Sequence, residues 1–193
     1  AGKMKEGILT HLWDEEHGRF ARGLYVQDGI WVKDMTLESS VYGVFEFGVL
    51  PADDERVMKT MRAILLGLSV KTSVGGIARY ENDYYFQRSA DITIIPGNPW
   101  IICTLWVAEW EIECAKTVEE LAFPLRTIEW VAQHAMESGI LSEQLDPIDG
   151  SPVSVAPLTW SHATFVLACV KYTEKYLLLS KVKSPGLAEI QSY

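Results

Sequence analysis

The segment from Trp100 to Trp110 is apolar on nearly every face and holds one charged residue, Glu109. It follows Asn98 and Pro99, which suit the cap and the first position of a helix. A helix that is apolar all round has to be buried all round. The chain is therefore predicted to enclose an inner helix, beginning at Asn98-Pro99, within further layers of secondary structure.

Five further segments have the apolar spacing or the capping residues of helices. They cover about residues 4–13, 36–48, 53–68, 117–131 and 159–179. Pro124 is expected to kink the fourth of them, because proline lacks the backbone donor that a helix interior needs. Largely apolar helices alternate with amphipathic ones. This pattern predicts two concentric layers of antiparallel helical hairpins, with loops free to build a site at one end.

The remaining segments are expected to be extended or irregular. Residues 18–32 contain three glycines among apolar residues, which predicts a loop or a small hairpin. Residues 71–97 have clustered aromatic side chains and no sustained period, so we expect a long loop of the kind that is more often functional than connective. A second loop is expected over residues 138–157. One domain should span residues 1–180, followed by a frayed tail over 181–193.

Net charge and cysteine content limit which classes of partner and which cellular compartment are expected. The formal charge is −9 and no run of Lys and Arg occurs, which argues against binding to nucleic acid or to a membrane surface. Three cysteines in apolar segments cannot all pair, which favours free thiols in a reducing cytoplasm. Neither a signal peptide nor a membrane span is expected. The four histidines lack metal-ligand spacing, so we expect no metal and no cofactor.

Five blocks occur in an order that resembles the second half of the glucoamylase-like glycoside hydrolases, family 15. They are Leu50-Pro51-Ala52-Asp53-Asp54, Ala78-Arg79-Tyr80-Glu81-Asn82-Asp83, Asn98-Pro99-Trp100, Ser138-Gly139-Ile140-Leu141-Ser142-Glu143-Gln144 and Pro157-Leu158-Thr159-Trp160-Ser161-His162-Ala163. The resemblance spans most of residues 18–177. It implies an all-α fold made of the later helical hairpins of a six-hairpin (α/α)6 toroid, in the C-terminal portion of a catalytic domain.

The resemblance also implies a site. In the family, one Glu protonates the leaving oxygen of an α-glucosidic bond and a second Glu activates water, with inversion. By match, Glu143 is the second of these, the general base. The implied substrate contacts are Arg79, Tyr80, Asp83, Trp100, Gln144 and Trp160. A glycine- and proline-bounded loop beside a hydrogen-bonding Gln144 suits a base that must stay charged and reach water.

The residues alone leave plainer alternatives open. Glu143 could be a solvated loop carboxylate, and Trp100 could belong to the core. Arg79 and Asp83 could form a surface ion pair beside a half-buried Tyr80. If the resemblance is discarded, the chain is an α-helical protein whose aromatic loops are only structural.

No block here matches the general acid of the family, which lies in the earlier half of the toroid. Other carboxylates are available, but none suits that role: Asp34, Glu38, Glu46 and Glu109. Losing the acid removes a contribution of about 10²- to 10⁴-fold. We therefore expect a fragment of an inverting α-glucosidic hydrolase that supplies the general-base half and is inactive alone. The alternative is a non-catalytic carbohydrate-binding or interaction module on the same fold.

Partners follow from the same reasoning. The expected ligand is an α-linked gluco-oligosaccharide or trehalose, in carbohydrate metabolism or polysaccharide degradation. Half a toroid should leave inner faces uncovered, at Trp100–Trp110 and on the helix that begins near Trp160. An apolar patch of that size predicts self-association or association with a missing N-terminal half.

Overall fold

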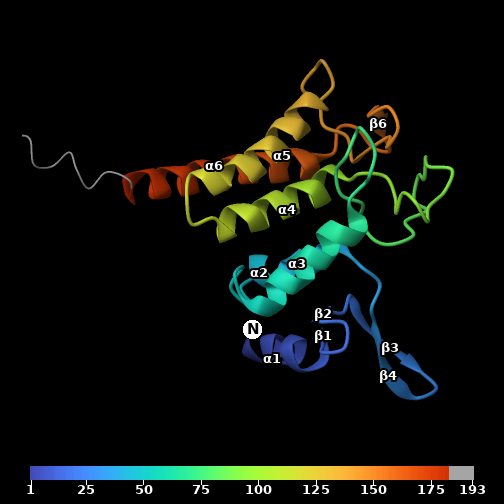
Figure 1. Ribbon diagram of the computed structural model, residues 1–193. Helices are drawn as coiled ribbons and strands as arrows, with labels where there is room; N and C mark the ends of the chain where they lie inside the picture. The colour runs from blue at the N-terminus through green and yellow to red at the C-terminus, as the bar shows by residue number, and fades with distance from the viewer. Residues whose placement is uncertain (183–193) are drawn as a thin grey trace, which may run out of the picture.

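The computed structural model describes residues 1–182 and is dominated by helices stacked in layers (Figure 1). The α-helices are α1 (Gly2–His11), α2 (Gly43–Glu46), α3 (Glu55–Leu68), α4 (Ile101–Cys114), α5 (Ala122–Gln133) and α6 (Thr159–Val182). Two 3-10 turns, η1 (Ser39–Tyr42) and η2 (Glu119–Leu121), precede α2 and α5. The strands form two-stranded antiparallel pairs: β1 (Trp13–Asp14) with β2 (Arg19–Phe20), β3 (Gly23–Gln27) with β4 (Ile30–Asp34), and β5 (Gln144–Leu145) with β6 (Pro152–Val153).

The inner helix predicted from the sequence is α4, which lies in the middle of the stack (Figure 1). Eleven of its fourteen residues are buried. One side, including Trp106, packs in a core cluster with Met61 and Ile64 of α3. The other side, including Leu105, packs in a second cluster with Val131 of α5 and Ala168 of α6. Since α4 supplies both clusters, its lack of a polar face is explained.

The expectation that Trp100–Trp110 would be partly uncovered is wrong, because α3, α5 and α6 enclose that segment. One exposed apolar surface lies instead along one side of α6. We call it the α6 face; it comprises Trp160, Val166, Leu167, Val170 and Leu177, each between 42% and 60% exposed. The part of the earlier expectation that concerned the Trp160 helix is therefore confirmed.

The helix starts differ from expectation in two places. Residues 36–38 are extended, and only η1 and the short α2 follow them, because the backbone at Leu37 and Ser39 pairs with Glu81 and Arg79. The Glu38 side chain accepts a hydrogen bond from Ser40 N and so caps η1. The α4 helix begins at Ile101 rather than at Pro99, with an extended Trp100 in the cap position.

Pro124 does not kink a helix. It lies in the first turn of α5, where a missing backbone donor costs little, and η2 forms the turn before it. Thr117 Oγ1 accepts a hydrogen bond from Glu120 N, as a capping residue does, while the Glu120 carboxylate accepts from Lys116 N. The predicted capping signal therefore marks the correct region, although the helix begins later than expected.

The two ends of the chain bear on other expectations. The predicted hairpin over residues 18–32 is confirmed as β3 and β4. At the other end, α6 continues through Val182, so the start of the expected tail is helical, while residues 183–193 lie outside the described residues. None of the helices within residues 1–182 combines the length and the apolar character needed to cross a membrane.

Candidate active site

Five extended segments form a continuous ribbon at the end of the molecule where α4 and α6 begin. Single-residue bridges join them in the order Glu38 to Tyr80, Ala78 to Pro99 and Trp100 to Gln144, and β5 then pairs with β6. Trp100 N donates to Ile77 O, and Ile101 N donates to Glu143 O at 3.2 Å. The ribbon therefore brings three of the sequence blocks, which lie far apart between Ala78 and Gln144, into adjacent strands of backbone.

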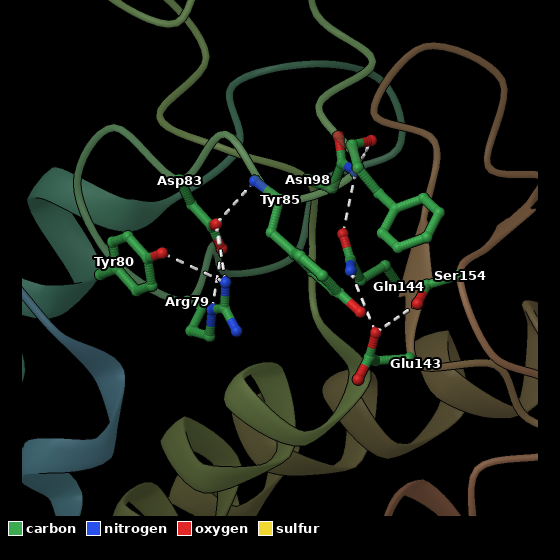
Figure 2. Close-up of polar contacts among 9 residues, drawn as sticks. Arg79, Tyr80, Asp83, Tyr85, Asn98, Glu143, Gln144 and Ser154 are labelled. Carbon is green, nitrogen blue, oxygen red and sulfur yellow. Dashed lines mark hydrogen bonds and ion pairs between the residues drawn. The ribbon is translucent and has the colours of Figure 1, made fainter.

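Arg79 lies at the centre of a charged and aromatic cluster (Figure 2). Its Nε and Nη2 donate to the two oxygens of Asp83 at 2.9 and 2.8 Å, and Nη2 also donates to the Tyr80 hydroxyl at 3.2 Å. Its guanidinium carbon lies 4.3 Å from the ring centre of Trp100 and 5.1 Å from that of Tyr85. Burial alone would lower the pKa of Arg79, but the hydrogen bonds and charge of Asp83 outweigh it and raise that pKa.

Glu143 directly precedes β5, on the segment that pairs with Trp100 through Gln144. Gln144 Nε2 donates to Glu143 Oε2 at 3.2 Å, and the hydroxyl of Ser154 donates to the same oxygen. Oε1 has no hydrogen-bond partner within residues 1–182, and Figure 2 shows it turned away from Gln144 and Ser154. The carboxylate is therefore held through one oxygen while the other stays available.

The two tryptophans of the predicted site differ in exposure. Trp100 is 4% exposed, and its Nε1 has no partner in the described part of the chain. Trp160 is 55% exposed, and its helix turn is tied to the Glu143 segment because Ser161 Oγ donates to Ser142 O at 2.8 Å. Trp100 is thus a core residue packed against Arg79, whereas Trp160 lies open beside the Glu143 segment.

Asp83 and Gln144 differ from the expectation of direct sugar contact. Asp83 is 1% exposed, and its oxygens accept from Arg79 and from Tyr85 N. Gln144 is 0% exposed and bonds to Glu143 and Asn98. Both side chains lie behind the residues that face the site, where they hold those residues in place. The Arg79–Asp83 ion pair exists, but it is partly buried rather than on the surface.

The site includes residues that the sequence interpretation missed. Asn98 is 1% exposed and, instead of capping α4, bonds to Gln144. Ser154, in the left-handed backbone region at φ 65°, reaches Glu143 from beyond β6. Tyr85 lies beside both Arg79 and Trp100. The sequence held one signal for Asn98, a polar residue just before the buried Trp100. Nothing in the local sequence singles out Ser154 or Tyr85.

The carboxylates that the sequence left as weak candidates for an acid all have protein partners. Asp34 pairs with Arg22, Glu38 caps η1, and Glu46 and Glu109 both pair with Lys171. Burial raises the pKa of Glu38, in part against the effect of its bond to Ser40. Each of these four carboxylates is therefore engaged in an ion pair or a capping hydrogen bond within the protein.

The fold and the site together define a class: an incomplete helical toroid that carries one available carboxylate beside an arginine–aromatic cluster. Residues 112–170, which include Glu143 and Trp160, match the model of glycosyl hydrolases family 15. An uncharacterized glycosyl hydrolase of Methanocaldococcus jannaschii is 31% identical over 85% of this chain and 25% of its own length. A glucoamylase of Clostridium sp. is 28% identical over 72% of this chain and 20% of its own length.

Solved structures show the same fold. A bacterial glucoamylase complexed with acarbose superposes with a TM-score of 0.71 at 22% identity, over 92% of this chain and 29% of that one. Glucoamylase from Saccharomycopsis fibuligera gives 0.63 at 15% identity, over 90% of this chain and 48% of that one. The resemblance to glycosyl hydrolases family 15, predicted from the sequence blocks, is thereby confirmed, as is the all-α partial (α/α)6 toroid. The chain spans a quarter or less of the length of the two curated relatives described.

Proposed function

We propose that this chain supplies the general-base side of an inverting α-glucosidic hydrolase. Glu143 activates the water, Arg79 hydrogen-bonds to sugar hydroxyls, and the faces of Tyr80 and Trp160 border the sugar ring, while the buried Trp100 packs against Arg79. An Arg fork suits neighbouring hydroxyls, and flat aromatic faces suit the C–H surface of a pyranose. Asp83 and Gln144 hold Arg79 and Glu143 in orientation.

One observation carries this proposal: in the ribbon, the backbone of Pro99 and Trp100 lies between the segment that holds Arg79 and the segment that holds Glu143. A base needs one oxygen directed at water while the carboxylate stays fixed, and the free Oε1 of Glu143 meets that need. The relatives named glucoamylase and isomaltose glucohydrolase make α-linked gluco-oligosaccharides the first substrates to test, with trehalose as a third linkage.

An inverting hydrolase needs two carboxyls roughly 6.5 to 9.5 Å apart, and the second would come from the portion of the family fold that this chain does not span. We therefore expect no hydrolysis by the chain alone. The test is glucose release from maltooligosaccharides, isomaltose and trehalose by the chain and by a polypeptide that extends it with the remaining helices of the fold. Release by the extended polypeptide alone supports the proposal. Release by the short chain, or sugar binding without any hydrolysis in both, contradicts it.

The α6 face is proposed to be the surface that meets the rest of the toroid, or a second copy of the chain when that part is absent. Exposed apolar side chains that follow one another along one helix are typical of a surface that contacts another protein. Replacing Val170 with Asp should therefore shift the isolated chain from oligomer toward monomer in analytical ultracentrifugation. Ile148→Asp, at a residue that is 62% exposed in a distant loop, is the matched control. A chain that is monomeric before substitution would rule out this role for the face.

The compartment is a further part of the proposal. All three cysteines are free, and Cys103 is fully buried. Burial raises the pKa of the Cys103 thiol well above its ordinary value, which keeps it unreactive. Free thiols of this kind suit a cytoplasmic protein.

A further inference from the structure

A chain of hydrogen bonds through two buried amides joins Glu143 to the aromatic loop at residues 84–88 (Figure 2). Gln144 Nε2 donates to Glu143, and Gln144 Oε1 accepts from Asn98 Nδ2 at 2.9 Å. Asn98 Nδ2 also donates to Phe86 O at 2.8 Å, and Asn98 Oδ1 accepts from Arg88 N at 3.1 Å. Both N–H donors and the oxygen of the Asn98 amide are therefore in use, as are the oxygen and one N–H donor of the Gln144 amide.

The partners at both ends of this hydrogen-bond chain determine which way the two amides are oriented. At the loop end, Arg88 N can only donate and Phe86 O can only accept, so the Asn98 amide has one possible orientation. In that orientation the NH₂ group of Asn98 points at Gln144, so the Gln144 side chain must accept the hydrogen bond through its oxygen. The NH₂ group of Gln144 then faces Glu143, whose ionised carboxylate can only accept. The Asn98 amide thus determines which end of the Gln144 amide meets the carboxylate.

We infer that Asn98 is a positioning residue: it orients the Gln144 amide and, through it, the Glu143 carboxylate, and it makes that orientation depend on the conformation of residues 84–88. This inference rests on the proposed function only for its catalytic consequence. The hydrogen-bonded geometry itself can be tested without any substrate.

At the loop end of the hydrogen-bond chain the backbone is strained, and the bonds from Asn98 help to stabilise it. Phe86 lies in the left-handed region at φ 53°, a backbone conformation that is unfavourable for a bulky side chain. In this conformation the preceding residue, Tyr85, places its ring 6.1 Å from that of Trp100, and its backbone N bonds to Asp83. The bonds from Asn98 to Phe86 and Arg88 therefore stabilise the turn that also places Tyr85 against Arg79. One buried amide serves the sugar-binding side and the base side together.

Replacing Asn98 with Asp isolates this role, because the shape is kept and the donor is lost. The aspartate can still accept from Arg88 N, but its other oxygen would face Phe86 O and Gln144 Oε1, which are both acceptors. Gln144 is then expected to reverse its amide and lose its bond to Glu143. Asn82→Asp is the matched control, since Asn82 is exposed, lies in the same loop and makes no hydrogen bond with any of residues 1–182.

The first measurement is NMR of the chain itself without sugar, following the side-chain amide of Gln144 and the carboxyl carbon of Glu143. Their signals are assigned by their loss in Gln144→Met and Glu143→Gln. We expect Asn98→Asp to shift the Glu143 carbon about as much as Gln144→Met does, while Asn82→Asp leaves it in place. If Asn98→Asp shifts only signals of residues 84–88, Asn98 braces the loop alone and the inference is wrong.

A reciprocal measurement keeps the test decisive if Asn98→Asp does not fold. Glu143→Gln alters a partly exposed side chain and should still shift the Asn98 amide, two hydrogen bonds away; an unchanged Asn98 amide would overturn the inference. In the extended polypeptide, Asn98→Asp should lower kcat about 10- to 100-fold with little change in KM. If that polypeptide is inactive before substitution, the proposed function fails while the NMR result still decides the role of Asn98.

Discussion

Replacing Glu143 with Gln should lower kcat for α-glucoside hydrolysis by about 10²- to 10⁴-fold in the extended polypeptide, with a much smaller change in KM. Glutamine keeps the size of the side chain but cannot accept a proton from water. The substitution leaves Arg79 and Trp160 untouched, so the ground-state contacts with sugar should persist. The measurement is initial-rate glucose release across a range of substrate concentrations.

The matched control for this substitution is Glu137→Gln. Glu137 is exposed, lies in the same loop region before Glu143, and has no hydrogen bond or ion pair in the described part of the chain. It should retain the parent kcat. If Glu143→Gln keeps full activity, the assignment of the base is wrong. If both variants lose activity equally, the loss reports damage to the loop rather than the loss of a base.

The elements with a strong pattern were predictable, and α4 is the clearest. Its uniform apolar character required burial on every side, and the structure encloses it between two core clusters. The start of α4 was not predictable, because Asn98 and Pro99 look like a cap and a first position. Their backbone belongs to the ribbon, where Leu145 N donates to Pro99 O at 3.0 Å. Pairing with a distant segment overrode a good local signal.

The candidate site was predictable as a set of residues but not as an arrangement. The bridges of the ribbon join single residues, so they leave no periodicity in the sequence. Which side chains face the site and which lie behind it depends on that ribbon. Asp83 and Gln144 look like sugar contacts from their types alone, yet both are buried against protein partners. Close packing at Gly76 is equally invisible, although a Cβ there would lie 2.7 Å from Pro99.

Replacing Lys171 with Met should destabilise the chain by about 3–5 kcal/mol, because it leaves a buried charge without its partner. Lys171 Nζ lies 2.8 Å from Glu109 Oε2, and the Glu109 side chain is 1% exposed. Glu109 Oε1 has no hydrogen bond among residues 1–182. The bond from Lys171 to Oε2 is therefore the main compensation for burying this carboxylate. Urea unfolding of the isolated chain measures the change.

A control and a rescue separate the lost partner from other effects. Lys175→Met removes the same charge one turn later on α6, where the ammonium only donates to Glu113 O, and should cost far less. Adding Glu109→Gln to Lys171→Met removes the unpaired charge and should restore much of the stability. Equal losses in Lys171→Met and Lys175→Met would show that the buried pair contributes nothing particular.

The pH dependence gives an independent check on the same pair. Burial raises the pKa of Glu109, while Lys171 acts in the opposite direction, so removing Lys171 should raise that pKa further. A carboxyl with a raised folded-state pKa binds its proton more tightly in the folded chain than in the unfolded one. Folding is then most favourable in acid and weakens as pH rises from the ordinary value of 4.5 through the raised one. The loss caused by Lys171→Met should accordingly be smallest below about pH 4.5 and grow toward neutral pH, whereas a loss independent of pH would place its origin in packing.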